Sequence, residues 1–264
     1  MKTLAAVALS LVPSCAWAQE GAEIVGVKDR LWFPAMSGDV RASGDVFEGT
    51  TIDVDETFNF GKPELFNDLI AWVNVPLLVI DRISAGYWFG GYRETETVSE
   101  TFRFGDDQFT VGADLLAKLD MKVFTATLEK FLLAPGTDEL GVALGVELGV
   151  KYFDLTAAVS SDALSLDEER TLKGPLPIVG GHLIAQITKW LRAEAEVTGI
   201  YVAYAGIRGY YAELVAEVAF QPIKQILVGV GYKLVLFNVE DTANDEFDVD
   251  LSMGGFFVSA GVKF

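Results

Sequence analysis

The chain has 264 residues, with 38 acidic and 20 basic side chains and a formal net charge of −18. Such a surplus of negative charge argues against nucleic-acid binding, which needs a basic surface, and against docking on bare anionic lipid headgroups. No apolar run after residue 18 approaches the roughly 18 residues that a membrane-spanning helix needs. Any membrane-spanning structure must therefore be built from strands that close into a barrel.

The beginning of the chain has the three features of a secretory signal peptide. A positive residue, an apolar stretch and a small-x-small cleavage site are supplied by Lys2, residues 4–12 and Ala16-Trp17-Ala18. We predict a signal peptide at 1–18 and a single domain at 19–264. The alternative is a lipoprotein signal with Cys15 as the lipidated residue, although Pro13 makes a poor lipobox. The predicted mature chain has no cysteine, so backbone pairing and packing must hold it together.

Alternating apolar and polar residues predict five strands in the first half of the chain. They cover residues 23–33, 65–75, 82 to beyond 92, 109–132 and 140–153. The long polar stretch 37–64 is predicted to be an outer loop that folds back into a barrel mouth, with a short turn of structure at 54–60. In the fourth strand the apolar positions are odd up to Val123 and even from Phe124. This change indicates either a β-bulge or a strand that leaves the membrane and continues above it.

The same alternation predicts five more strands in the second half. They cover residues 178–187, 191–198, 210–220, 226–236 and 255–264. The connections after even-numbered strands are short, whereas those after odd-numbered strands are mostly longer and acidic, as at 160–173 and 240–250. An even number of strands places both chain ends on the same side.

The last strand carries a family resemblance. Its even positions are Phe256, Val258, Ala260, Val262 and Phe264, and the chain stops on the aromatic residue. This ending resembles the C-terminal signature of bacterial outer-membrane β-barrels, with Phe264 as the assembly signal. The resemblance implies an all-β, antiparallel transmembrane β-barrel with short periplasmic turns, long acidic outer loops and periplasmic termini. About ten strands are expected; eight or twelve would also fit.

The resemblance also implies a location and a set of partners. The protein is expected in the outer membrane of a Gram-negative bacterium, in contact with outer-membrane lipid and lipopolysaccharide. The barrel-assembly machinery would be its partner during biogenesis, and we expect no nucleic-acid partner.

The alternation also predicts which charged side chains face the barrel lumen. The bases are Lys28, Arg30, Arg82, Lys151, Arg192, Lys233 and Lys263; the acids are Asp68, Glu129, Glu147, Glu194, Glu196, Glu213 and Glu217. Seven bases against seven acids predict a nearly neutral, salt-bridged and largely filled lumen, because a barrel of this size has little room inside. The expected function is therefore a structural or interaction barrel. The alternatives are a narrow channel for small solutes or cations and a lipid-modifying enzyme.

Candidate catalytic and metal-binding residues are few. The single histidine, His182, lies close to a predicted periplasmic turn rather than at the outer rim, so we expect a hydrogen-bonding role and no enzymatic activity. Only oxygen ligands remain for a metal ion, which would be loosely bound Ca²⁺ or Mg²⁺. The acidic stretches that could supply them contain Asp53, Asp55 and Glu56; Asp167, Glu168 and Glu169; and Asp245, Glu246, Asp248 and Asp250. These stretches could share divalent cations with lipopolysaccharide phosphates, and no other cofactor is expected.

Overall fold

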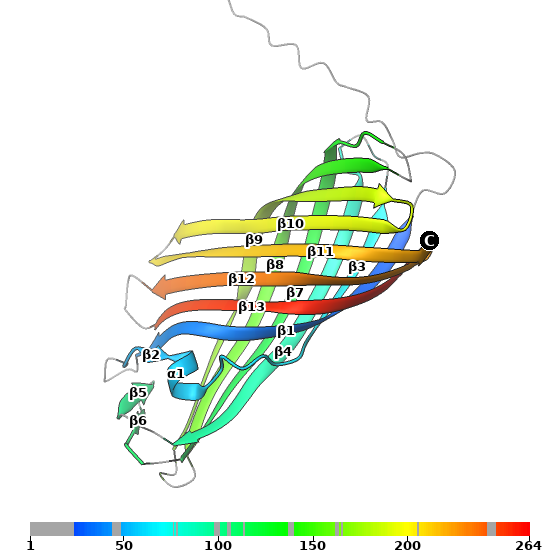
Figure 1. Cartoon of the computed structure of the whole chain (residues 1–264). Coiled ribbons are helices and arrows are strands. Elements are labelled where there is room, and N and C mark those ends of the chain that lie inside the picture. Colours follow the sequence, from blue (N-terminus) through cyan, green and yellow to red (C-terminus); the bar gives the residue numbers. More distant parts are fainter. Residues whose placement is uncertain are drawn as a thin grey trace, which may run out of the picture.

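A computed structural model shows a closed antiparallel β-barrel of ten strands (Figure 1). It describes residues 24–43, 49–75, 77, 79–97, 101–104, 107–112, 114–136, 140–161, 164, 166–204, 206–241 and 247–264. The predicted signal peptide lies outside this range. The barrel strands are β1 (Val25–Ala42), β3 (Phe66–Asn74), β4 (Arg82–Thr97), β7 (Asp114–Leu133), β8 (Gly141–Ser161), β9 (Leu166–Thr188), β10 (Leu191–Tyr204), β11 (Ile207–Ile223), β12 (Ile226–Asp241) and β13 (Phe247–Lys263).

Each barrel strand pairs with its neighbour in chain order, and β13 pairs with β1 to close the sheet. The closing seam is continuous from Gly26 opposite Lys263 to Ala42 opposite Phe247. At one end of the barrel, residues 189–190 and 224–225 form tight turns, and the first described residue bonds to the last, since the amide of Ile24 donates to the carbonyl of Phe264. The predicted strand number is thus confirmed, and the first and last described residues lie at the same end of the barrel.

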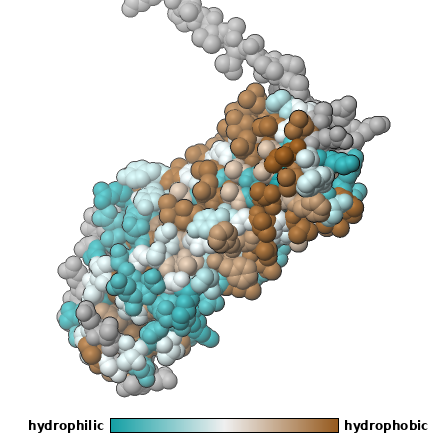
Figure 2. All heavy atoms as spheres, viewed as in Figure 1, coloured by the Kyte–Doolittle hydropathy of each residue, from teal (hydrophilic) through white to brown (hydrophobic). Residues whose placement is uncertain are grey.

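The half of the barrel near the C-terminus is apolar on its outer surface, and the opposite half is polar (Figure 2). Aromatic side chains on the outward face are well exposed, among them Phe33, Tyr87, Phe89, Tyr152, Tyr201, Tyr210, Phe220 and Phe264. A wide belt of exposed aliphatic and aromatic residues has no role in water, whereas it matches the lipid-facing band of a membrane barrel.

Strand β7 shows how the two halves differ. On its outward face Asp120 and Lys122 give way to the exposed Phe124 and Leu128, while the inward face changes from buried Met121 to polar residues. Its pairing with β4 runs without interruption from Asp114 to Glu129. The β-bulge interpretation is therefore wrong near Val123. The strand keeps its register and continues beyond the apolar band, which was the other interpretation.

The strands extend further than their predicted bounds, so parts of two predicted loops are strand. The stretch 37–64 begins as the end of β1, and 160–173 contains the end of β8 and the start of β9. Phe109 does not begin the fourth barrel strand; it ends β6 (Asp107–Phe109), which forms a small hairpin with β5 (Phe102–Phe104). Strands of twenty residues and more exceed the roughly 9–11 needed to span a membrane, so much of the barrel lies outside it.

A short segment covers the polar end of the barrel, where β2 (Ile52–Asp53) leads into the helix α1 (Val54–Phe58). Asp53 caps the helix by accepting hydrogen bonds from the amides of Asp55 and Glu56, and Asn59 ends it in the left-handed conformation. Phe58 packs on Phe102 of the hairpin at 6.0 Å. The predicted turn of structure at 54–60 is confirmed. No helix in the described part of the chain is long and apolar enough to cross a membrane.

Candidate functional site in the barrel lumen

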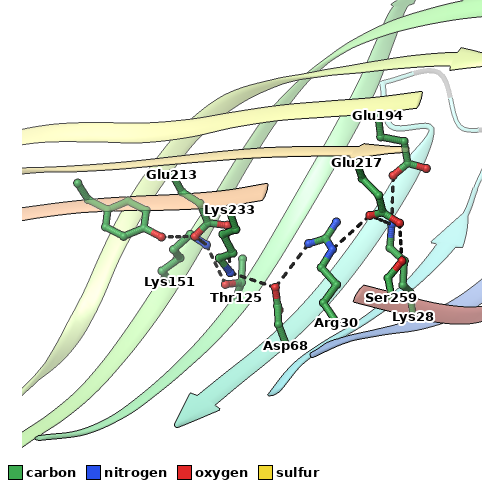
Figure 3. A network of polar contacts seen from close by, with 11 residues as sticks. Lys28, Arg30, Asp68, Thr125, Lys151, Glu194, Glu213, Glu217, Lys233 and Ser259 are labelled. Atoms are coloured by element: carbon green, nitrogen blue, oxygen red, sulfur yellow. Dashed lines mark hydrogen bonds and ion pairs between the residues drawn. The ribbon is translucent and has the colours of Figure 1, made fainter. Parts of the chain in front are cut away.

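Charged and polar side chains from the ten barrel strands converge in the half of the lumen that the apolar outer band surrounds. Figure 3 shows the larger of two networks, in which acidic and basic side chains alternate across the lumen. Buried charges are tolerated only where they are paired and hydrogen-bonded. This layer, which we call the charged layer, is the candidate functional site.

The larger network begins at Glu213, which accepts a hydrogen bond from the Tyr211 hydroxyl and pairs with Lys151 at 3.0 Å. Lys233 links Glu213 to Asp68, at 3.7 Å and 3.0 Å respectively. Lys233 is 1% exposed, and its ammonium also lies 4.9 Å from the Trp32 ring and 5.3 Å from the Trp88 ring.

The network continues to the closing seam of the barrel. Arg30 pairs with Asp68 at 3.5 Å and with Glu217 at 3.4 Å. Glu217 also accepts from Lys28 at 2.9 Å and from the Ser259 hydroxyl at 2.7 Å. Lys28 in turn reaches Glu194 at 3.2 Å. Side chains of β1, β10, β11 and β13 are thereby tied together across the lumen.

The smaller network joins β4, β7 and β9. Glu129 pairs with Arg82 at 3.5 Å and contacts His182 Nδ1 at 2.9 Å. Arg82 also donates to the side-chain oxygen of Asn74 at 2.8 Å. His182 is thus held by a carboxylate inside the lumen, on the stretch of β9 that precedes the turn at 189–190.

A cavity of about 90 Å³ lies within the charged layer. Its wall includes members of both networks, such as Glu129, Lys151 and His182, together with Glu147 and Glu196. Oxygen Oε1 of Glu147 is buried without a hydrogen-bond partner. A cavity of this size holds several water molecules or a small ion.

The other half of the lumen is filled by apolar side chains, which we call the apolar layer. Met121, Phe153, Tyr211 and Phe237 meet there around a space of about 10 Å³, which is room for one water molecule at most. Trp32, Phe66 and Tyr92 join the same cluster. The Tyr92 hydroxyl donates to the carbonyl of Pro34 at 2.9 Å, and burial followed by the charge of Glu64 raises the pKa of Tyr92.

Several inward glycines serve close packing. A Cβ on Gly231 would lie 2.3 Å from the Phe257 ring, one on Gly145 would lie 2.5 Å from Glu129, and one on Gly229 2.6 Å from Glu217. Near the chain ends, Trp72 covers Gly26 in the same way and packs with Ala219 and Leu227. Large side chains therefore cross the lumen where the opposite position has none.

The structure brings nearly all of the predicted lumen charges together. Those that are buried are Lys28, Arg30, Asp68, Arg82, Glu129, Glu147, Lys151, Arg192, Glu213, Glu217 and Lys233. Glu194 and Glu196 are partly buried in the same layer, whereas Lys263 is partly buried at the end of β13. Sequence reasoning missed the apolar layer, although the exchange of faces along β7 was a signal for it.

The acidic residues considered for metal binding are dispersed. Asp53 and Asp55 accept hydrogen bonds from backbone amides around α1, and Asp167, Glu168 and Glu169 lie on β9 rather than in a loop. Asp248 and Asp250 likewise lie on β13, whereas Asp245 and Glu246 fall outside the described residues. Within the described ranges, no group of three or more His, Cys, Asp or Glu side chains is placed to hold a metal ion.

The fold is that of the outer-membrane β-barrel proteins, a class defined here by the closed antiparallel sheet and its apolar outer band. Among solved structures, the chain is similar to the outer membrane protease OmpT from Escherichia coli, with a TM-score of 0.50 and 12% identity, over 93% of this chain and 97% of that chain. This similarity shows the shared fold alone.

Two further outer-membrane barrels match with lower scores. One is the attachment invasion locus protein Ail of Yersinia pestis, with a TM-score of 0.35 and 10% identity over 92% of this chain and 100% of that chain. The other is the toluene transporter TodX of Pseudomonas putida, with a TM-score of 0.33 and 9% identity over 92% of this chain and 91% of that chain. No protein-family model matches the sequence, and no curated protein matches it.

Proposed function

We propose that this protein is an integral barrel of the Gram-negative outer membrane with a closed lumen, and that it works as a structural or interaction barrel. The observation that carries the proposal is the arrangement of the lumen, in which the charged layer is followed by the apolar layer. The space among Met121, Phe153 and Phe237 in the apolar layer is about 10 Å³, so we expect that neither a hydrated ion nor a small polar solute passes without displacing several large residues.

The end with the long connections is the part offered to other molecules. The charged pairs on the outer surface beyond the apolar band include Asp154–Lys173 at 3.1 Å and Arg208–Glu240 at 2.6 Å. In the proposed orientation this end faces the cell exterior, both termini are periplasmic, and the exposed Phe264 is read by the barrel-assembly machinery. Lipid contacts the apolar band, and lipopolysaccharide adjoins the polar wall above it.

His182 is proposed to be part of this internal scaffold and to have no catalytic role. Its contact with Glu129, in the layer where Glu129 also pairs with Arg82, supports a hydrogen-bonding role. The position of His182, several strand residues from the outer rim, favours the same assignment.

Planar-bilayer recording tests the closed lumen. The purified chain is refolded in detergent, and its folded state is verified by heat-modifiable electrophoretic mobility. It is then inserted into a planar bilayer at neutral pH in about 1 M salt. We expect no resolved conductance steps, because the apolar layer interrupts the water path. Reproducible steps, together with liposome swelling by small solutes, would instead favour the narrow channel.

A further inference from the structure

We propose that the cavity of the charged layer binds one small inorganic cation, held by the carboxylates of Glu147 on β8 and Glu196 on β10. Both side chains line the cavity of about 90 Å³. The two strands flank β9, where Gly180 is opposite Glu147 and adds no side chain, and His182, which also lines the cavity, is opposite Glu196.

The ion pairs of the charged layer do not include the carboxylates of Glu147 and Glu196. Glu129 pairs with Arg82, and four other acids of the layer have two basic partners each: Asp68, Glu194, Glu213 and Glu217. In the described part of the chain, Glu147 and Glu196 make no ion pair within 4.0 Å, and Glu147 Oε1 has no hydrogen-bond partner although Glu147 is only 6% exposed. A buried carboxylate oxygen without a donor is costly unless a cation or proton compensates it.

The charge balance of the layer also favours a bound cation. The buried and half-buried side chains of the two networks and the cavity include six bases, which are Lys28, Arg30, Arg82, Lys151, Arg192 and Lys233. The acids number seven: Asp68, Glu129, Glu147, Glu194, Glu196, Glu213 and Glu217. With His182 left out of the count, the layer is one negative charge in excess, and a bound monovalent cation would balance it.

The chemistry of the wall fits an oxygen-preferring ion. Carboxylates, the hydroxyls of Thr125 and Thr127 and trapped water are ligands of Na⁺, K⁺, Mg²⁺ and Ca²⁺. With two carboxylates the site falls short of a dedicated divalent cage, so we expect moderate affinity and retention of water by the ion.

The test is thermal unfolding of the full chain folded in zwitterionic detergent at pH 8 and low ionic strength. Chlorides of Na⁺, K⁺, Mg²⁺ and Ca²⁺ are compared with N-methylglucamine chloride at equal ionic strength, because that large organic cation screens charge but cannot fit the cavity. A cation at about ten times its dissociation constant should raise Tm by about 3–6 °C above the N-methylglucamine value. The Glu147→Gln variant should lose this difference, and Glu196→Gln serves if Glu147→Gln does not fold.

The matched control is Glu169→Gln, which removes an exposed carboxylate from the same barrel on β9. It should keep the full cation-specific difference. Equal Tm values in all salts would overturn the proposal, as would a difference that survives in both Glu147→Gln and Glu196→Gln. A Tm that rises on acidification but ignores the cations would show that the two carboxylates share a proton instead.

Discussion

Glu217 is the residue whose removal should most weaken the closed barrel. It lies on β11, yet its carboxylate receives Lys28 and Arg30 from β1 and Ser259 from β13, at 2.9, 3.4 and 2.7 Å. Those two strands form the closing seam. Replacing Glu217 by glutamine keeps the shape of the side chain but removes its charge. Lys28 then depends on Glu194 and Arg30 on Asp68.

The expected cost follows from the burial of the pair. The Glu217 side chain is 0% exposed, and Lys28 is 5% exposed. Breaking a buried ion pair from one side costs about 3–5 kcal/mol, because the remaining charge stays buried without its partner. Because Lys28 and Arg30 each keep another carboxylate partner, we expect Glu217→Gln to lower the free energy of unfolding by about 3 kcal/mol, near the lower end of this range. The double variant with Lys28→Met should lose less than the sum of the two single changes.

Urea or guanidinium unfolding of the barrel in detergent or lipid vesicles measures these differences. The control is Glu240→Gln. Glu240 lies on β12 and pairs at 2.6 Å with Arg208, which is on β11 like Glu217, and both side chains of this pair are solvent-exposed. The hydrogen bond to Glu240 raises the pKa of Arg208, but water screens this pair, so its loss should be hard to resolve. Equal effects of Glu217→Gln and Glu240→Gln, or simple additivity with Lys28→Met, would refute the network.

Two further substitutions test the packing of the lumen and the cap. Gly26→Leu should destabilise the barrel by roughly 1–3 kcal/mol, because even a Cβ there would lie 2.2 Å from the Trp72 ring. The control is Gly86→Ala, where the nearest contact of the added Cβ is at 3.6 Å. An equal loss of stability for the two variants in denaturant unfolding would contradict the argument. Phe58→Ala should speed limited proteolysis of residues 49–65 without moving the global unfolding midpoint, since Phe58 packs on the hairpin Phe102 at the barrel end; a shifted midpoint would show that the cap supports the barrel itself.

The membrane-embedded half of the fold could be predicted from the sequence, because lipid outside and charge inside give a strict two-residue alternation. Strand β8 is the plainest case, with Val142, Leu144 and Val146 exposed and Glu147 buried. The ends of the strands could not be predicted in the same way. Beyond the apolar band β8 and β9 carry polar residues on the outward face, such as Thr156 opposite Thr171, and a polar outward stretch is indistinguishable from a loop by composition.

The members of the charged layer could be named from their parity along the strands, but their pairing could not. Lys233 and Asp68 are 165 residues apart, and Arg30 reaches Glu217 across 187. Which base meets which acid depends on the tilt and stagger of the closed sheet, and these emerge only when all ten strands are in place. The same applies to Glu147 and Glu196, which form no ion pair with a described residue, and this is visible only after the other acids are assigned.

Along β7 the apolar residues change from the inward face to the outward face, because water surrounds one part of the strand and lipid the other. Where lipid lies outside, Phe124 and Leu128 face outward and the lumen takes the polar groups, because lipid offers them no partners. Where water lies outside, Asp120 and Lys122 face outward and Met121 and Val123 pack inward, as in the core of a water-soluble barrel. The boundary at residues 123–124 therefore fixes the depth of the barrel in the membrane. In the proposed closed barrel, the apolar layer begins near this boundary, where Met121 and Val123 face the lumen.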